Sequence, residues 1–214
     1  MPNARLRVPE LATVEVSGIT RSAFMLRGAL AAGAIYGGSA VTPFVRQAIA
    51  QEAEGESGDV DILNFAYTLE VLEAAFYEKA LTQVKGLSGD VKELTTELRD
   101  NETEHVSVLT TMIRNLGGEP VPDPEVDFGD AFASEEKYLA LAQTFEDTGV
   151  SAYNGAAPQI KDKKLLAAAG TIVQIEGRHA ALIRFKRGAD IAPNAFDETL
   201  ERDEVLRAVD PYVV

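Results

Sequence analysis

The sequence predicts an all-α fold: a four-helix bundle made of two helical hairpins that one long crossover joins. Three observations support this prediction. Four long stretches carry apolar residues at helical spacing, and glycine or proline interrupts the chain after each stretch. Glutamate and histidine recur at matching positions in the two hairpins. With 214 residues, of which 46% are hydrophobic, the chain can form the core that such a bundle needs.

Charge and cysteine content exclude several classes of function. The formal net charge is −14, which argues against nucleic acid as a partner because phosphate binding requires clustered Lys and Arg. The chain has no cysteine, so disulfides, thiolate metal sites and thiol nucleophiles are excluded. Any bound metal must therefore be held by oxygen atoms and by the only two histidines.

Residues 1–50 differ from the rest and are interpreted as a leader. Eighteen uncharged residues lie between Arg27 and Arg46, and an Ala-Ile-Ala cleavage signal ends at residue 50. Residues 20–27 (TRSAFMLR) look like a twin-arginine export signal, from which Ser22 departs. A functional leader would place the protein in the periplasm or on the cell surface; otherwise it is cytoplasmic.

Two other readings of this segment stay open: a retained membrane anchor and a retained soluble helix. The anchor is disfavoured because the run is rich in glycine and barely long enough to span a bilayer. A polar linker follows at residues 51–58, and residues 59–214 are assigned to the bundle with its C-terminal tail.

The four helices are expected over residues 59–84, 90–116, 134–156 and 161–187. Asp90 and Glu93 resemble a capping box, and Ser134 precedes an acidic first turn. The expected helix ends are marked by Gly86, Gly117-Gly118, Pro158 and Gly188. Residues 117–133 are too long for a tight turn and are expected to run the length of the bundle.

Both histidines follow a glutamate by three residues, in the pairs Glu102–His105 and Glu176–His179. Residues three or four apart share one face of a helix, and each pair interrupts an apolar face in mid-helix. A solvated surface pair is the alternative, but it would place polar groups where the periodicity places the core. These four residues are therefore candidate metal ligands.

The first and third helices supply matching acids, Glu70 and Glu146, each followed seven residues later by a tyrosine, Tyr77 and Tyr153. Glu70 and Glu146 are 76 residues apart, and the two Glu–His pairs are 74 residues apart. Surface charges have no reason to keep such a register. We expect the tyrosines to relay an electron or to donate a hydrogen bond to a ligand; plain core aromatics are the alternative.

Burial of four carboxylates in an apolar core without a compensating positive charge would be energetically prohibitive, because each buried unpaired ion costs several kcal/mol. Two divalent cations would balance them. Carboxylate and imidazole ligands suit iron best, manganese also, and do not exclude zinc. Glu102 and Glu176 are the expected bridges, Glu70 and Glu146 the terminal ligands, with one histidine for each metal. Glu73, whose counterpart is Gly149, is a further ligand or, preferably, a hydrogen-bonding neighbour of one.

These residues resemble the ferritin-like superfamily, in which two helices each supply Glu and two supply Glu-x-x-His. The matching stretches are residues 63–77, 101–109, 143–158 and 172–183. The crossover and residues 193–209 resemble a bacterial subgroup that carries twin-arginine leaders and is related to plant desiccation-associated proteins. The resemblance also implies a short C-terminal helix.

The function expected from this site is that of a di-iron or di-manganese oxidoreductase. It would oxidise Fe(II) or reduce oxygen or peroxide in a protective role. The alternative is a non-catalytic structural or stress protein of the desiccation type, in which the metals only stabilise the bundle. Iron storage in a large shell is a third reading. A homo-oligomer is possible, and a stable membrane span is not favoured.

Overall fold

The computed structural model describes residues 58–214, and within them the fold is helical. Four long helices are present: α3 (Asp59–Gln83), α4 (Gly89–Asn115), α5 (Glu135–Ala156) and α6 (Lys163–Lys186). A short helix, α7 (Arg202–Val209), follows, with 3₁₀ turns at Ala131–Ala133, Ala157–Gln159 and Asp210–Tyr212. The described residues contain no strand, so the all-α prediction is confirmed. The predicted leader (1–50), and the predicted linker as far as residue 57, lie outside the described residues.

The observed helix ends agree with the predicted ones to within two residues, and local chemistry explains most of them. Ser134 caps α5, since its hydroxyl accepts a hydrogen bond from the Lys137 amide at 3.2 Å. Three of the helices end just before a glycine with positive φ, at Gly86 (79°), Gly117 (82°) and Gly188 (67°).

The predicted capping box at Asp90 is wrong. Helix α4 begins at Gly89 with Ser88 as its N-cap, so Asp90 lies inside the first turn. Its carboxylate instead pairs with the ammonium of Lys186 at the end of α6. A long-range partner on another helix has replaced the local backbone partner, which a local sequence pattern does not reveal.

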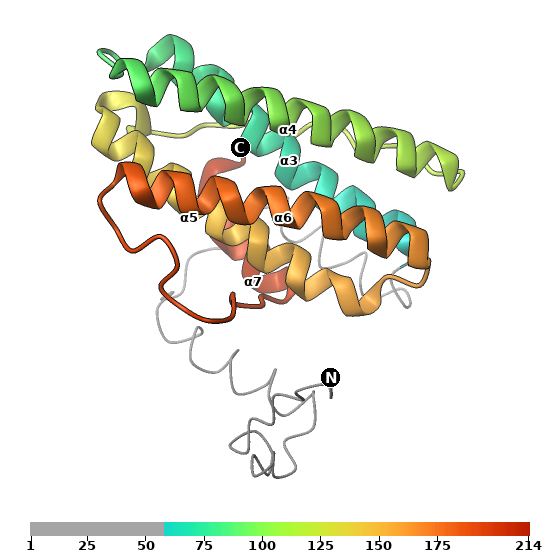
Figure 1. The fold of residues 1–214 in the computed structure, drawn as a ribbon. Coiled ribbons are helices and arrows are strands. Elements are labelled where there is room, and N and C mark those ends of the chain that lie inside the picture. Colours follow the sequence, from blue (N-terminus) through green and yellow to red (C-terminus); the bar gives the residue numbers. More distant parts are fainter. Residues whose placement is uncertain (1–57) are drawn as a thin grey trace, which may run out of the picture. The chain divides into compact units, whose positions relative to one another are not determined.

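The helices form two hairpins that lie one above the other (Figure 1). Within the hairpins α3 packs along α4 and α5 along α6; between them α3 contacts α5 and α4 contacts α6. The crossover follows α3, because Tyr67 donates to the Asp123 carboxylate at 2.7 Å and Lys79 donates to the Val126 carbonyl at 3.0 Å. It therefore returns the chain to the far end of the bundle, and α5 runs antiparallel to α3. The predicted ferritin-like bundle is confirmed.

The C-terminal tail covers one side of α5. The Leu200 amide donates to the Ser151 carbonyl at 3.2 Å, and its own carbonyl oxygen would lie 2.0 Å from a Cβ at Gly155. Only glycine at 155 leaves room for this approach. Helix α7 then packs on α5, and an isolated bridge joins Val213 to Val126 of the crossover. The expected short C-terminal helix is therefore present.

The core has two parts, which differ in composition. Where α3 ends, rings pack on one another; this aromatic end consists of Phe76, Tyr77, Phe128, Phe132, Tyr138, Phe145 and Tyr212. Where α3 begins, the core is mostly aliphatic; this aliphatic end consists of Leu63, Tyr67, Leu109, Ile113, Tyr153, Leu165 and Ile172. Between the two ends lies the polar layer that contains the candidate site.

No helix among the described residues combines the length and apolar character needed to cross a membrane.

Candidate metal centre

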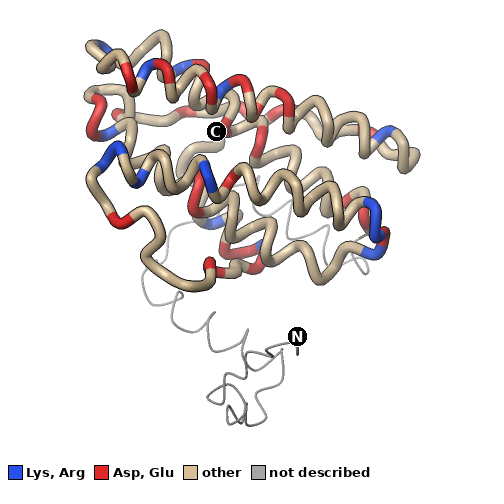
Figure 2. Tube along the Cα trace, in the orientation of Figure 1, with Lys and Arg blue, Asp and Glu red and all other residues tan. Residues whose placement is uncertain are grey.

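The structure brings all six candidate ligands together between the four helices. Charged positions occur along every long helix (Figure 2), but the ligand residues differ from the others in being buried. None of them exposes more than 8% of its surface, a value reached only by His105. The alternative of solvated surface pairs is therefore wrong. Helix α3 contributes Glu70 and α5 contributes Glu146, while α4 contributes Glu102 and His105 and α6 contributes Glu176 and His179.

The first group of ligand atoms surrounds His105. Its Nδ1 atom lies 3.0 Å from a Glu102 oxygen, 3.1 Å from a Glu70 oxygen and 3.1 Å from a Glu176 oxygen. Three helices thus direct carboxylates at one imidazole nitrogen. One N–H bond cannot point at three oxygens, whereas one cation can lie among all of them.

The second group surrounds His179. Its Nδ1 atom lies 2.8 Å from the other Glu102 oxygen and 3.5 Å from a Glu146 oxygen, and Glu176 completes the group. Glu102 and Glu176 therefore belong to both groups, whereas Glu70 and Glu146 belong to one each. This is the placement expected of two bridging and two terminal carboxylates.

The two predicted tyrosines contact the terminal carboxylates crosswise. Tyr77 of α3 donates a hydrogen bond to Glu146 of α5, and Tyr153 of α5 donates one to Glu70 of α3 at 2.5 Å. The antiparallel course of α3 and α5 explains this exchange, since each tyrosine lies two turns beyond the glutamate of its own helix. The hydrogen-bonding role expected for these tyrosines thus has its geometry in the structure.

Glu73 is a fifth buried carboxylate in this layer, with 3% of its surface exposed. A Cβ at Gly149 would lie 3.3 Å from a Glu73 oxygen and 3.2 Å from a Glu176 oxygen. A side chain at 149 would therefore crowd the carboxylates of Glu73 and Glu176, which would have to shift by a few tenths of an ångström. No hydrogen bond joins Glu73 to another described residue, and the expected bond to a ligand is not observed in this structure.

Asn101 is a neighbour of the site that the sequence analysis missed. Its side-chain amide lies 3.1 Å from Nε2 of His179. When Nδ1 binds a metal, Nε2 carries the proton, and the amide would present its oxygen to accept it. Asn101 shares a face of α4 with Leu98 and His105, three and four residues away, but this spacing does not show what its side chain contacts.

Burial and mutual repulsion raise the pKa of most of the acids. Burial raises the pKa of Glu70 to about 8, against the opposing effect of the His105 hydrogen bond. Burial, followed by neighbouring carboxylates, also raises the pKa of Glu73 and Glu176 well above the usual range. Each acid that ionises here does so among other acids in a low-dielectric layer.

The histidines show the opposite balance. Burial alone would lower their pKa, but the adjacent carboxylates of Glu102, Glu176 and Glu70 raise the pKa of His105 to about 12. The adjacent carboxylates of Glu102 and Glu146 likewise raise the pKa of His179 to about 10. Without a metal, protonated imidazoles supply positive charge to the layer, and protons on the acids remove part of its negative charge.

The donor set fits a pair of metal ions. Glu102 Oε1, Glu146 Oε2, both oxygens of Glu176 and His179 Nδ1 are buried without a hydrogen-bond partner among the described residues. Buried polar atoms are normally paired, so these atoms point to a missing partner. Ligand atoms held at about 2.1 Å and at right angles around one ion lie about 3 Å apart. The shortest separations around both histidines, 2.8–3.1 Å, match this spacing.

A family model described as a ferritin-like domain matches residues 58–189. The match spans more than half of the chain, including the four long helices and every candidate residue of the site. No curated protein matches the chain.

Proposed function

The chain belongs to the family of ferritin-like domains, and we propose that its buried carboxylate–histidine layer binds two metal ions for redox chemistry. The reaction is the oxidation of Fe(II) coupled to the reduction of oxygen or peroxide. The observation that carries this proposal is the convergence of carboxylates from three helices on a single nitrogen of His105. Such convergence needs a positive charge at its centre.

Two groups of ligands support two metal positions. Glu70 and His105 would hold one ion, Glu146 and His179 the other, and the two groups share Glu102 and Glu176. Iron or manganese suits this mixture of carboxylate and imidazole ligands. When bound, such a pair supplies two electrons within one buried site.

The reaction balances with Fe(II) as the electron donor. Two Fe(II) ions give up two electrons, and one peroxide takes up these electrons and two protons to form two waters. With oxygen as the acceptor, the same two electrons and two protons form one hydrogen peroxide. Removal of Fe(II) and peroxide together would be protective, because the two otherwise react with each other.

The residues around the ligands hold them in place. Tyr77 and Tyr153 each donate a hydrogen bond to one oxygen of a terminal carboxylate, which leaves the other oxygen directed at a histidine. Hydrogen bonds to charged groups contribute about 1.5–3 kcal/mol each, enough to restrict the carboxylate orientation. The tyrosines also carry phenol groups at the site, which is what an electron relay requires.

The test compares the full-length protein with a Glu102→Ala, Glu176→Ala double variant. We expect the wild type to contain two metal ions per chain and to oxidise Fe(II) faster than free Fe(II) oxidises in buffer. The double variant should lose both properties. Glu104→Ala is the matched control, because Glu104 lies on the same helix but faces solvent. Equal rates for the wild type and the double variant would exclude the redox proposal.

A structural role for the metals is the second candidate, and the burial of every ligand favours it. A closed site can stabilise the bundle without admitting a substrate. This alternative, which would suit a protein of desiccation stress, predicts a melting temperature that depends on metal but no consumption of oxygen or peroxide. Export through a leader stays a prediction, since residues 1–50 lie outside the described residues.

A further inference from the structure

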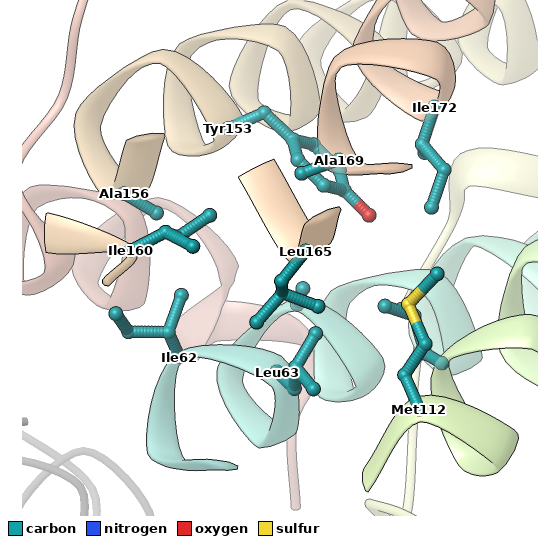
Figure 3. Close-up of a pocket in the computed structure, with 11 residues that line it drawn as sticks. Ile62, Leu63, Met112, Tyr153, Ala156, Ile160, Leu165, Ala169 and Ile172 are labelled. Atoms are coloured by element: carbon teal, nitrogen blue, oxygen red, sulfur yellow. The ribbon is translucent and has the colours of Figure 1, made fainter. Parts of the chain in front are cut away.

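The aliphatic end of the bundle contains a cavity (Figure 3), and Tyr153 connects it to the polar layer. The cavity has a volume of about 20 Å³. Eleven residues line it, and all of them are apolar except Tyr153. Several lining residues, among them Ala66, Met112 and Ile160, are half-buried, so the cavity lies near the protein surface.

The cavity lies directly beyond the candidate ligands on three helices. On α3, Ala66 and Leu63 precede Glu70 by one and two turns. The other two helices repeat this spacing at Leu109 and Met112 after His105, and at Ile172 and Ala169 before Glu176. Residues one and two turns from a ligand share its face, so the cavity follows the axis of the bundle toward the site.

Tyr153 joins the cavity to the site. Its hydroxyl points into the space between Leu165, Ala169 and Ile172 in Figure 3. The same hydroxyl donates to Glu70 at 2.5 Å. A molecule in the cavity would therefore be separated from a candidate metal ligand by one phenol group.

The centre of the opposite end is closely packed. Phe76 has no exposed surface and lies within 5.0–5.4 Å, centroid to centroid, of five other aromatic rings. Tyr77, the counterpart of Tyr153, is also fully buried among these rings, whereas Tyr153 retains 8% exposure. Two tyrosines with equivalent hydrogen bonds therefore have different surroundings.

The apolar lining favours small apolar molecules over ions and polar molecules. An ion or a hydrated metal would lose its hydration here without gaining ligands, a cost of several kcal/mol or more. Hydrogen peroxide would lose its hydrogen bonds, with Tyr153 as the only polar side chain available. Small apolar molecules lose little, and apolar cavities of proteins do bind such guests, xenon among them.

We propose that this cavity is the entry site for dioxygen, which reaches the metal layer from the aliphatic end past Tyr153. The proposal rests on the proposed redox function and makes dioxygen, rather than peroxide, the oxidant that the site is built to admit.

The first test uses xenon and needs no activity. Crystals of the full-length protein, pressurised with xenon, should show one bound atom between Leu63, Met112 and Ala169, with and without metal. Absence of xenon from this cavity would overturn the proposal whatever the protein does with iron.

The second test fills the cavity. Ala169→Phe should exclude xenon and raise the KM for oxygen several-fold, while Fe(II) oxidation driven by peroxide and the metal content stay unchanged. Ala167→Phe is the matched control, because Ala167 lies two residues away on the exposed face of α6. If Ala169→Phe does not fold, Ala66→Leu fills the same space from α3.

The outcomes separate the two proposals. A filled cavity with an unchanged KM for oxygen would exclude this route while leaving the redox function in place. A rate loss shared by oxygen and peroxide would show damage to the site and also count against the route. Xenon in the cavity of a wild type that oxidises no Fe(II) would refute the proposed function, and with it a route for dioxygen.

Discussion

The aromatic and aliphatic ends lie on opposite sides of one polar layer, and they obey different constraints. The layer itself is nearly symmetric, because each hairpin supplies one glutamate that belongs to a single ligand group, one glutamate shared by both groups, and one histidine. The packing around it is not, since one end is filled by rings and the other by aliphatic side chains around a cavity. Charge balance requires the paired ligands, whereas packing requires only filled volume.

Removal of metal should have the largest effect on the stability of the protein. A ligand at 1,000 times its Kd stabilises a folded protein by about 4 kcal/mol per site, so chelation should lower the melting temperature strongly. Calorimetry with chelator, and then with metal restored, measures this change. Hydrogen exchange should also show more loss of protection at Leu63, Leu109 and Ile172 than around Phe76. Equal loss of hydrogen-exchange protection at both ends would contradict the predicted difference between them. An unchanged melting temperature would argue against any role for metal.

Truncation of core side chains should cost more at the aromatic end. Phe76→Ala removes a fully buried ring from among five others and should lower the free energy of unfolding by about 4 kcal/mol. Leu165→Ala enlarges an existing cavity near the surface and should cost about 2 kcal/mol. Urea unfolding of the metal-loaded variants decides the order. A larger loss for Leu165→Ala would mean that the aliphatic end is the more tightly packed.

The two tyrosines should differ although their hydrogen bonds correspond. Tyr77→Phe leaves the buried Glu146 without its donor and should cost about 1.5–3 kcal/mol. Tyr153→Phe should cost less, because Tyr153 retains 8% exposure, so solvent is closer to its hydrogen bond to Glu70, whereas Tyr77 is fully buried.

Unfolding free energy and metal affinity, measured together, test this difference. Tyr67→Phe is the control, since it also removes a hydrogen bond to a carboxylate, that of Asp123, but outside the site. Its metal affinity should equal that of the wild type. Identical effects of the two site tyrosines would mean that their surroundings do not matter.

The smallest effects on the free energy of unfolding should come from polar contacts at the two ends of the bundle. At the aliphatic end, Asp59 accepts hydrogen bonds from the amides of Lys161 and Asp162, both at 2.9 Å. Asp59→Ala should cost about 1 kcal/mol. At the aromatic end, Asp90 pairs with Lys186 in solvent, so Asp90→Ala should have a smaller effect that salt abolishes. Thermal unfolding at low and high salt compares the two; equal, salt-independent losses would contradict this expectation.

Much of the fold could be predicted because its signals are local. Apolar spacing and helix-ending glycines placed four helices to within two residues. The Glu-x-x-His pairs identified the polar layer because each pair interrupts an apolar face, and periodicity alone reveals that. Asp90 shows where local reasoning fails: its carboxylate satisfies a capping pattern, yet a lysine 96 residues away on another helix is its partner.

The sequence by itself determined that four acids and two histidines lie on the apolar faces of their helices, because their spacing places them there. It did not determine what Glu73 contacts, which tyrosine serves which glutamate, or that Asn101 reaches His179. It also gave no sign of the cavity at the aliphatic end. Those features depend on how four helices are oriented and separated in space, to within an ångström or so. Only the tertiary structure specifies distances of that size, because hydrogen bonds and cavities arise between segments and not within them.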